Sequence, residues 1–87
     1  MATVWMTPML RDIMNGQKEA TVPGATVREV IEGLEIRFPG MRERLCKSGQ
    51  LDPAITAIVD GLVSPLGLAA PVQPDSEIHF LPMLGGG

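Results

Sequence analysis

The chain has 87 residues, of which 45% are hydrophobic, and its seven basic and ten acidic residues give a formal net charge of −3. This length and composition predict one globular domain rather than a disordered chain. The acidic balance, the scattered basic residues and the 3% aromatic content argue against nucleic-acid binding, and no segment is long and apolar enough to span a membrane.

Residues 3–10 are rich in β-prone side chains that roughly alternate in polarity. We expect a strand here, with Val4 on one face and Trp5 and Thr7 on the other. Pro8 has no backbone N–H for a strand ladder, so it should stand at the end or the edge of the sheet.

A turn at Asn15-Gly16 precedes a second β-prone segment at residues 18–22. Two short strands joined by a modest loop predict a hairpin at the start of the chain.

Residues 26–38 carry the clearest pattern, that of an amphipathic helix. Thr26 and Glu29 have the spacing of a capping box. The apolar residues of this segment recur at helical period and predict one buried stripe: Val27, Val30, Ile31, Leu34 and Phe38. Gly33 costs about 1 kcal/mol relative to alanine inside a helix, which predicts close packing there, and Pro39 should end the helix.

The segment after this helix predicts shorter elements. Residues 40–50 favour a helical turn that breaks at Ser48-Gly49, and residues 54–63 favour a strand that enters a tight turn at Asp60-Gly61.

An irregular loop rich in proline and glycine then leads to a last strand at residues 77–82, with Ile78 and Phe80 facing inward. Its outward side chains are Glu77, His79 and Leu81.

The order β-β-α-β-β, with one amphipathic helix to cover one face of one sheet, predicts a small α+β roll. Its last strand should lie beside its first.

Enzyme chemistry finds little support in the sequence. One histidine, His79, and one cysteine, Cys46, cannot build a metal site, and no phosphate-binding loop pattern is present. We interpret His79 as a surface residue and Cys46 as a structural or incidental thiol. A single cysteine and the lack of signal-peptide features predict a cytoplasmic protein.

The glycines at residues 85–87 follow directly on an apolar strand end. Glycine has no side chain to pack and loses the most conformational freedom on folding. Either the run is inert, or it supplies a thin, flexible backbone that ends in a carboxylate. We favour the second interpretation, with a folded domain at residues 1–82 and a tail at residues 83–87.

Several segments, taken in order, carry a resemblance to a known family. They are "LR", "KEATV", "GATVREVIEGLE", "FPGMRERL", "ITAIVDG" and "PDSEIHFLPMLGGG". The set resembles the ubiquitin-like sulfur-carrier proteins of the MoaD/ThiS type, and within them the CysO type is the most similar. The resemblance implies a β-grasp fold, a mixed sheet of four to five strands with one main amphipathic helix on one face. Asp60 stands where the family often has asparagine, which we expect to alter only a turn.

The resemblance also implies how the tail is used. An ATP-dependent adenylyltransferase/sulfurtransferase of the ubiquitin-activating type would adenylate the carboxylate of Gly87, which then becomes a thiocarboxylate. The acceptor would be a synthase, with cysteine synthase favoured and the large subunit of molybdopterin synthase second. A side chain on Gly86 or Gly87 would clash in a narrow channel. No permanently bound cofactor is expected, since ATP is used by the activating enzyme.

Docking of such a tail calls for an exposed apolar patch near its base. The candidates for this patch are Trp5, Ile58, Leu81, Met83, Leu84 and Gly85. Strand alternation places the first three on the face of the sheet that the helix leaves free, unless Trp5 and Ile58 pack under a loop. Two other functions stay open: a ubiquitin-like modifier conjugated to proteins through Gly87, and a non-covalent binding module with an inert tail.

Overall fold

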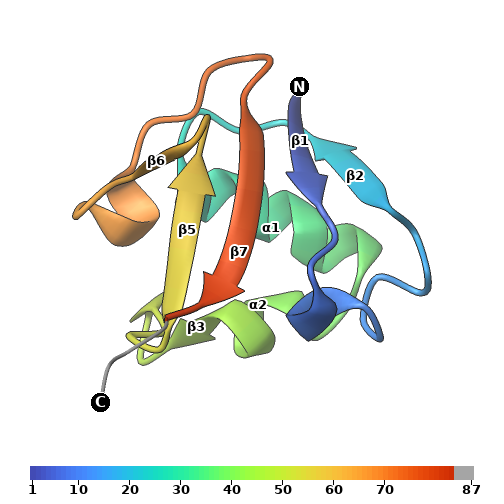
Figure 1. Cartoon of the computed structure of the whole chain (residues 1–87). Coiled ribbons are helices and arrows are strands. Elements are labelled where there is room, and N and C mark those ends of the chain that lie inside the picture. Colours follow the sequence, from blue (N-terminus) through green and yellow to red (C-terminus); the bar gives the residue numbers. More distant parts are fainter. Residues whose placement is uncertain (84–87) are drawn as a thin grey trace.

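A computed structural model describes residues 1–83, and in that range a five-stranded mixed sheet is crossed on one face by one main helix (Figure 1). Across the sheet the strands run β2 (Glu19–Val22), β1 (Ala2–Trp5), β7 (Glu77–Pro82), β5 (Ile55–Val59) and β6 (Leu62–Val63). The first and last strands, β1 and β7, lie side by side, as expected. They pair in parallel, and the other neighbours pair antiparallel. The remaining elements are η1 (Pro8–Leu10), α1 (Val27–Arg37), α2 (Met41–Leu45), β3 (Cys46–Lys47), β4 (Gln50–Leu51) and η2 (Gly67–Ala69).

Helix α1 begins and ends where the sequence predicts. The Thr26 hydroxyl accepts a hydrogen bond from the Glu29 N–H at 3.3 Å, and the Glu29 carboxylate accepts one from the Ala25 N–H at 3.0 Å. The first bond satisfies an N–H group that the first turn of a helix leaves free, and the second ties the residue just before the N-cap to that turn. At Gly33, an added Cβ would come within 3.1 Å of the Val22 Cβ, so the predicted close packing is confirmed.

The core lies between α1 and the covered face of the sheet. All five residues of the predicted helical stripe are buried, and so are the inward residues of β7, Ile78 and Phe80. Outside these elements, the core is completed by residues from both halves of the chain, among them Leu10, Met14, Met41, Leu45 and Leu68.

The first strand is shorter than the sequence predicts. It ends at Trp5, and Pro8, with its fixed φ, opens the 3₁₀ helix η1 instead. The alternation therefore stops before Thr7, whose predicted outward placement is wrong. Thr7 is only 4% exposed, and its hydroxyl donates a hydrogen bond to the Phe80 carbonyl at 2.8 Å.

The second half of the chain contains more structure than the sequence predicts. The segment expected as one strand at residues 54–63 is a hairpin, β5 and β6, which turns at Asp60 and Gly61, both with positive φ. The loop that follows includes η2 and is joined to the start of α1. The Val27 N–H donates to the Ala70 carbonyl at 3.0 Å, and the Val72 N–H donates to the Ala25 carbonyl at 2.9 Å.

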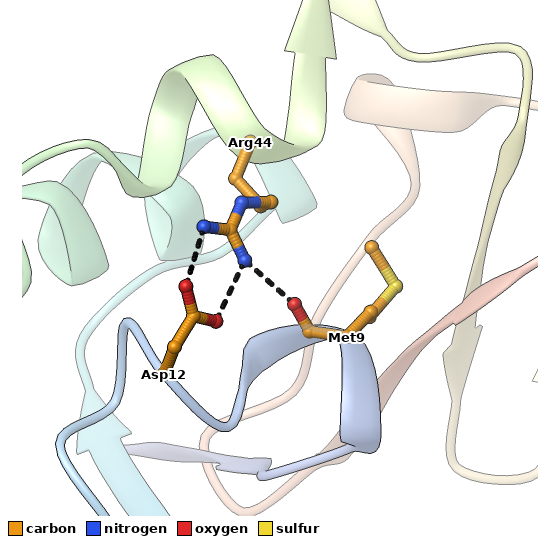
Figure 2. Close-up of polar contacts among 3 residues, drawn as sticks. All are labelled: Met9, Asp12 and Arg44. Atoms are coloured by element: carbon orange, nitrogen blue, oxygen red, sulfur yellow. Dashed lines mark hydrogen bonds and ion pairs between the residues drawn. The ribbon is translucent and has the colours of Figure 1, made fainter.

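A charged clamp joins α2 to the segment after β1 (Figure 2). The Arg44 guanidinium donates to both Asp12 carboxylate oxygens at 3.0 Å and to the Met9 carbonyl at 2.7 Å. The hydrogen bond from Arg44 lowers the pKa of the Asp12 carboxyl to about 2. These contacts join α2 and η1 at the end of the fold where β7 finishes (Figure 1).

Candidate functional site

The base of the C-terminal tail is fixed by the sheet. Strand β7 lies between β1 and β5, and its last residue, Pro82, is opposite Ile55. The next residue, Met83, donates its N–H to the Ala54 carbonyl at 2.7 Å, while its side chain is 54% exposed. The described chain therefore ends beside the start of β5, as the red strand in Figure 1 shows.

The face of the sheet opposite α1, called here the helix-free face, brings together residues distant in sequence. Trp5 on β1 is opposite His79 on β7, which is opposite Ile58 on β5. Residues opposite each other in a ladder share a face, so these three side chains form a row. Leu81 shares their face two residues further along β7. The placement of Trp5, Ile58 and Leu81 thus agrees with the expected alternation, and their role in docking stays a prediction.

The Trp5 side chain is held from two sides. Its indole N–H donates to the Glu77 carboxylate at 2.8 Å, and its ring stacks on His79 with centroids 6.4 Å apart and planes inclined by 11°. Both partners lie on β7, so Trp5 is a half-buried aromatic group with little freedom to reorient. His79, interpreted from the sequence as an ordinary surface residue, takes part in this arrangement.

The charges on the helix-free face are acidic. Glu19 is opposite Trp5 on β2, and Glu77 binds the indole of Trp5, so a carboxylate lies on each side of the ring. In the strands of residues 1–83, no position on this face carries lysine or arginine. A partner that covers Trp5 therefore meets an apolar centre with an acidic border.

Sequence reasoning missed Val63 and the second role of Asp60. Val63 is opposite Ile58 and 65% exposed, so it extends the row to the edge strand β6. The Asp60-Gly61 turn signal held enough information to place it, because a two-residue turn fixes the register of a hairpin.

Asp60 does more than form a turn, contrary to the expectation. Its carboxylate accepts hydrogen bonds from the Ser76 hydroxyl at 2.6 Å and from the Glu77 N–H at 2.9 Å. These two bonds lower the pKa of the Asp60 carboxyl. They also fix the start of β7, including Glu77, the partner of Trp5.

Outside the helix-free face, the sequence offered a thiol and the C-terminal residues as further candidate groups. Cys46 is half-buried, and burial raises the pKa of its thiol. Within residues 1–83 no cluster of His, Cys, Asp and Glu side chains has the make-up of a metal site. No helix in that same range has the length and apolar character to cross a membrane. The expected roles of Leu84, Gly85, Gly86 and Gly87 fall outside the described residues.

Known proteins were compared with the chain by sequence and by structure. The ThiS family pattern matches residues 10–87, while the comparison with curated proteins gave no match. A chain in the crystal structure of the Amycolatopsis orientalis BexX/CysO complex is 32% identical, with a TM-score of 0.90 and all of both chains covered. Mycobacterium tuberculosis CysO, an antigen, is 28% identical, with a TM-score of 0.87 over 97% of this chain and 100% of that one.

A third structure, that of small archaeal modifier protein 1 from Methanosarcina acetivorans, is 23% identical with a TM-score of 0.79, over 99% of this chain and 95% of that one. At this identity the likeness shows the fold alone.

The predicted β-grasp fold is confirmed, with its five-stranded mixed sheet and one main helix. The chain belongs to the ThiS family, whose members are sulfur carriers rather than enzymes, and its structure is CysO-like.

Proposed function

We propose that this chain carries sulfur as a thiocarboxylate on Gly87 and delivers it to a biosynthetic synthase. The observation that carries the proposal is the ThiS match, which extends from residue 10 through the terminal glycines. The 32% identity to a chain of the BexX/CysO complex favours a CysO-type carrier. Cysteine synthesis is therefore the favoured pathway, and molybdopterin synthesis is second.

Loading of the tail takes two steps. A Gly87 carboxylate oxygen attacks the α-phosphorus of ATP and displaces pyrophosphate, which gives an acyl-adenylate. Hydrosulfide, supplied by a sulfur donor, then attacks the carbonyl carbon and displaces AMP, leaving the thiocarboxylate. The activating enzyme performs this chemistry, and the carrier contributes a reactive end that fits a narrow channel because glycine has no Cβ.

The helix-free face is the proposed docking surface for these partners. Ordering the tail costs on the order of 1–2 kcal/mol per residue at each docking event, and contact by the folded domain must offset this cost. Trp5 suits the role, because aromatic side chains dominate interface energetics and its two contacts on β7 already fix its orientation. The acidic border formed by Glu19 and Glu77 favours partners that present lysine or arginine around an apolar centre.

The direct test is an intact-mass spectrum of the protein from its native cells under non-hydrolysing conditions. A species in which sulfur replaces one oxygen, mapped to Gly87, supports the carrier function. A cysteine adduct at the same end supports the cysteine pathway.

Other results of this measurement would contradict the proposal. A free carboxylate accompanied by lysine-linked conjugates would favour a ubiquitin-like modifier. A free carboxylate without conjugates would leave a non-covalent binding module with an inert tail.

A further inference from the structure

On the helix side of the sheet, a cavity of about 270 Å³ lies between α1, α2, β3 and η2. Its apolar lining comes from Ile31 and Leu68, both core residues. Its polar lining comes from Arg28, Glu32, Arg42 and Cys46. We call it the arginine pocket. Nothing in the proposed carrier function uses it.

The two arginines of this pocket lack protein partners among the described residues. Arg37 donates to the Thr21 carbonyl, and Arg44 is paired with Asp12. The guanidinium groups of Arg28 and Arg42, in contrast, make no hydrogen bond or ion pair within residues 1–83.

The electrostatics of the pocket favour an anion. Burial raises the pKa of the Cys46 thiol, and the positive charges of Arg28 and Arg42 act in the opposite direction. Both guanidinium groups therefore influence the same point in the cavity. Glu32 also lines the pocket. Hydrogen bonds from backbone N–H groups, chiefly that of Arg42, lower the pKa of the Glu35 carboxyl, and the charge of Arg42 helps to lower it, so carboxylates flank both arginines. An anion is therefore favoured at the two guanidinium groups themselves and not by the net charge of the surroundings.

We propose that the arginine pocket binds a small organic carboxylate. The carboxylate would lie between the guanidinium groups of Arg28 and Arg42, which suit two-point recognition of a planar anion. The apolar part of the ligand would pack on Ile31 and Leu68. Pockets for drug-sized ligands span roughly 300–1,000 Å³, so this one takes a smaller molecule. A neighbouring cavity of about 340 Å³ shares Arg28 and Leu68 and gives a longer ligand room to extend along η2.

Benzoate and its neutral counterpart benzamide test this proposal, because they have similar shapes and differ in charge. We expect benzoate, titrated into the ¹⁵N-labelled full chain at constant ionic strength, to cause saturable shifts at the amides of Arg28, Arg42, Cys46 and Leu68. Benzamide should bind at least tenfold more weakly. Equal binding of the two, or benzoate shifts that map elsewhere, would overturn the proposal.

Substitutions of the two arginines test whether their positive charges are needed for benzoate binding. Arg28→Gln and Arg42→Gln should each weaken benzoate binding about tenfold. Arg11→Gln is the matched control, because Arg11 is exposed, lies outside the pocket and loses the same charge. If the three variants bind benzoate alike, the arginines do not recognise the ligand.

Cys46 provides a readout in the unmodified protein, independent of how the variants fold. Because its thiol lines the pocket, saturating benzoate should slow its alkylation by iodoacetamide at least threefold, and benzamide at the same concentration should not. Alkylation at an unchanged rate in saturating benzoate would show that the carboxylate binds outside the pocket.

Discussion

At the scale of single residues, Trp5 decides whether the helix-free face is a docking surface. The side chain is half-buried, so its replacement by alanine should lower the free energy of unfolding by about 1–2 kcal/mol. Loss of a preoriented aromatic anchor should weaken binding to the activating enzyme by about 2 kcal/mol or more, roughly 30-fold in Kd. Calorimetry of the complex and urea unfolding of the variant measure the two effects.

Ile36→Ala is the control for this experiment. Ile36 is 83% exposed on α1, which covers the other face of the sheet. Its loss should change neither binding nor stability by more than about 0.5 kcal/mol. A Trp5→Ala protein that loses more than about 4 kcal/mol of stability and still binds its partner would place Trp5 in the core and remove the proposed surface.

Single residues also show where sequence reasoning reached its limit. The placement of Ile58 and Leu81 followed from strand alternation, a local property. The burial of Thr7 and the stacking of His79 on Trp5 did not follow, because each depends on contact with a strand more than 70 residues away in the sequence. Asp60 was recognised as a turn residue, but its bonds to Ser76 and Glu77 arise only when β5 and β7 pair.

At the scale of elements, the connection from β2 to α1 depends on Gly24. Its φ is +155°, and an added Cβ would come within 2.9 Å of the Val30 backbone nitrogen. Gly24→Ala should therefore destabilise the protein by about 1–3 kcal/mol, through backbone strain and a clash with the first turns of α1. Chemical denaturation measures this loss.

Gly49→Ala separates the two causes. Gly49 also has a positive φ, +77°, but an added Cβ would meet open space there. Its loss should be smaller, about 1 kcal/mol, from strain alone. Equal losses for both variants would show that α1 shifts away from residue 24 at no cost.

The clamp between α2 and the segment after β1 makes stability depend on pH. The pKa of Asp12 is about 2 in the folded chain against an ordinary 3.8, so its stabilising effect is complete above pH 3.8 and is lost as the pH falls toward 2. Asp12→Asn should lower Tm at pH 6 by a few degrees at most, since the Asp12 side chain is 74% exposed. At pH 2 most of the difference should disappear.

The check is a pair of thermal melts of the wild type and the variant at each pH. Asp75→Asn serves as the control, because Asp75 is exposed and its carboxylate accepts no hydrogen bond within residues 1–83. A Tm difference for Asp12→Asn that is the same at pH 6 and pH 2 would contradict the role of the charged pair.

Elements differed in how well the sequence predicted them. Helix α1 was predicted within one residue, because its cap, its apolar stripe and the proline after it are local signals. The segment between β6 and β7 was expected to be irregular. Leu68 and Ala70 of this segment are buried because the segment contacts the start of α1. The sequence of the segment alone does not predict that contact.

At the scale of the whole molecule, the two sides of the sheet present different charges. The helix-free face carries carboxylates around Trp5. The other side carries charges of both signs, since α1, α2 and β3 contain Arg28, Arg37, Arg42, Arg44 and Lys47 together with Glu29, Glu32, Glu35 and Glu43. The proposed protein partner and the proposed small carboxylate would therefore bind to separate surfaces, and occupancy of one should not block the other.

The fold and the tail should also be separable. Within residues 1–83, the core residues lie between Ala2 and Phe80, and the last backbone hydrogen bond is that of the Met83 N–H to the Ala54 carbonyl. Gly87→Val should thus leave Tm within about 1 °C of the wild type and reduce sulfur loading by at least 100-fold, because a branched side chain blocks approach of the carboxylate to the nucleotide. Intact-mass measurement after incubation with the activating enzyme, ATP and a sulfur donor gives the loaded fraction. Ile36→Ala, an exposed change on α1, keeps all three glycines and should still load. A Gly87→Val protein that loads as well as Ile36→Ala would show that the terminal position tolerates a side chain, which contradicts the proposed need for glycine there.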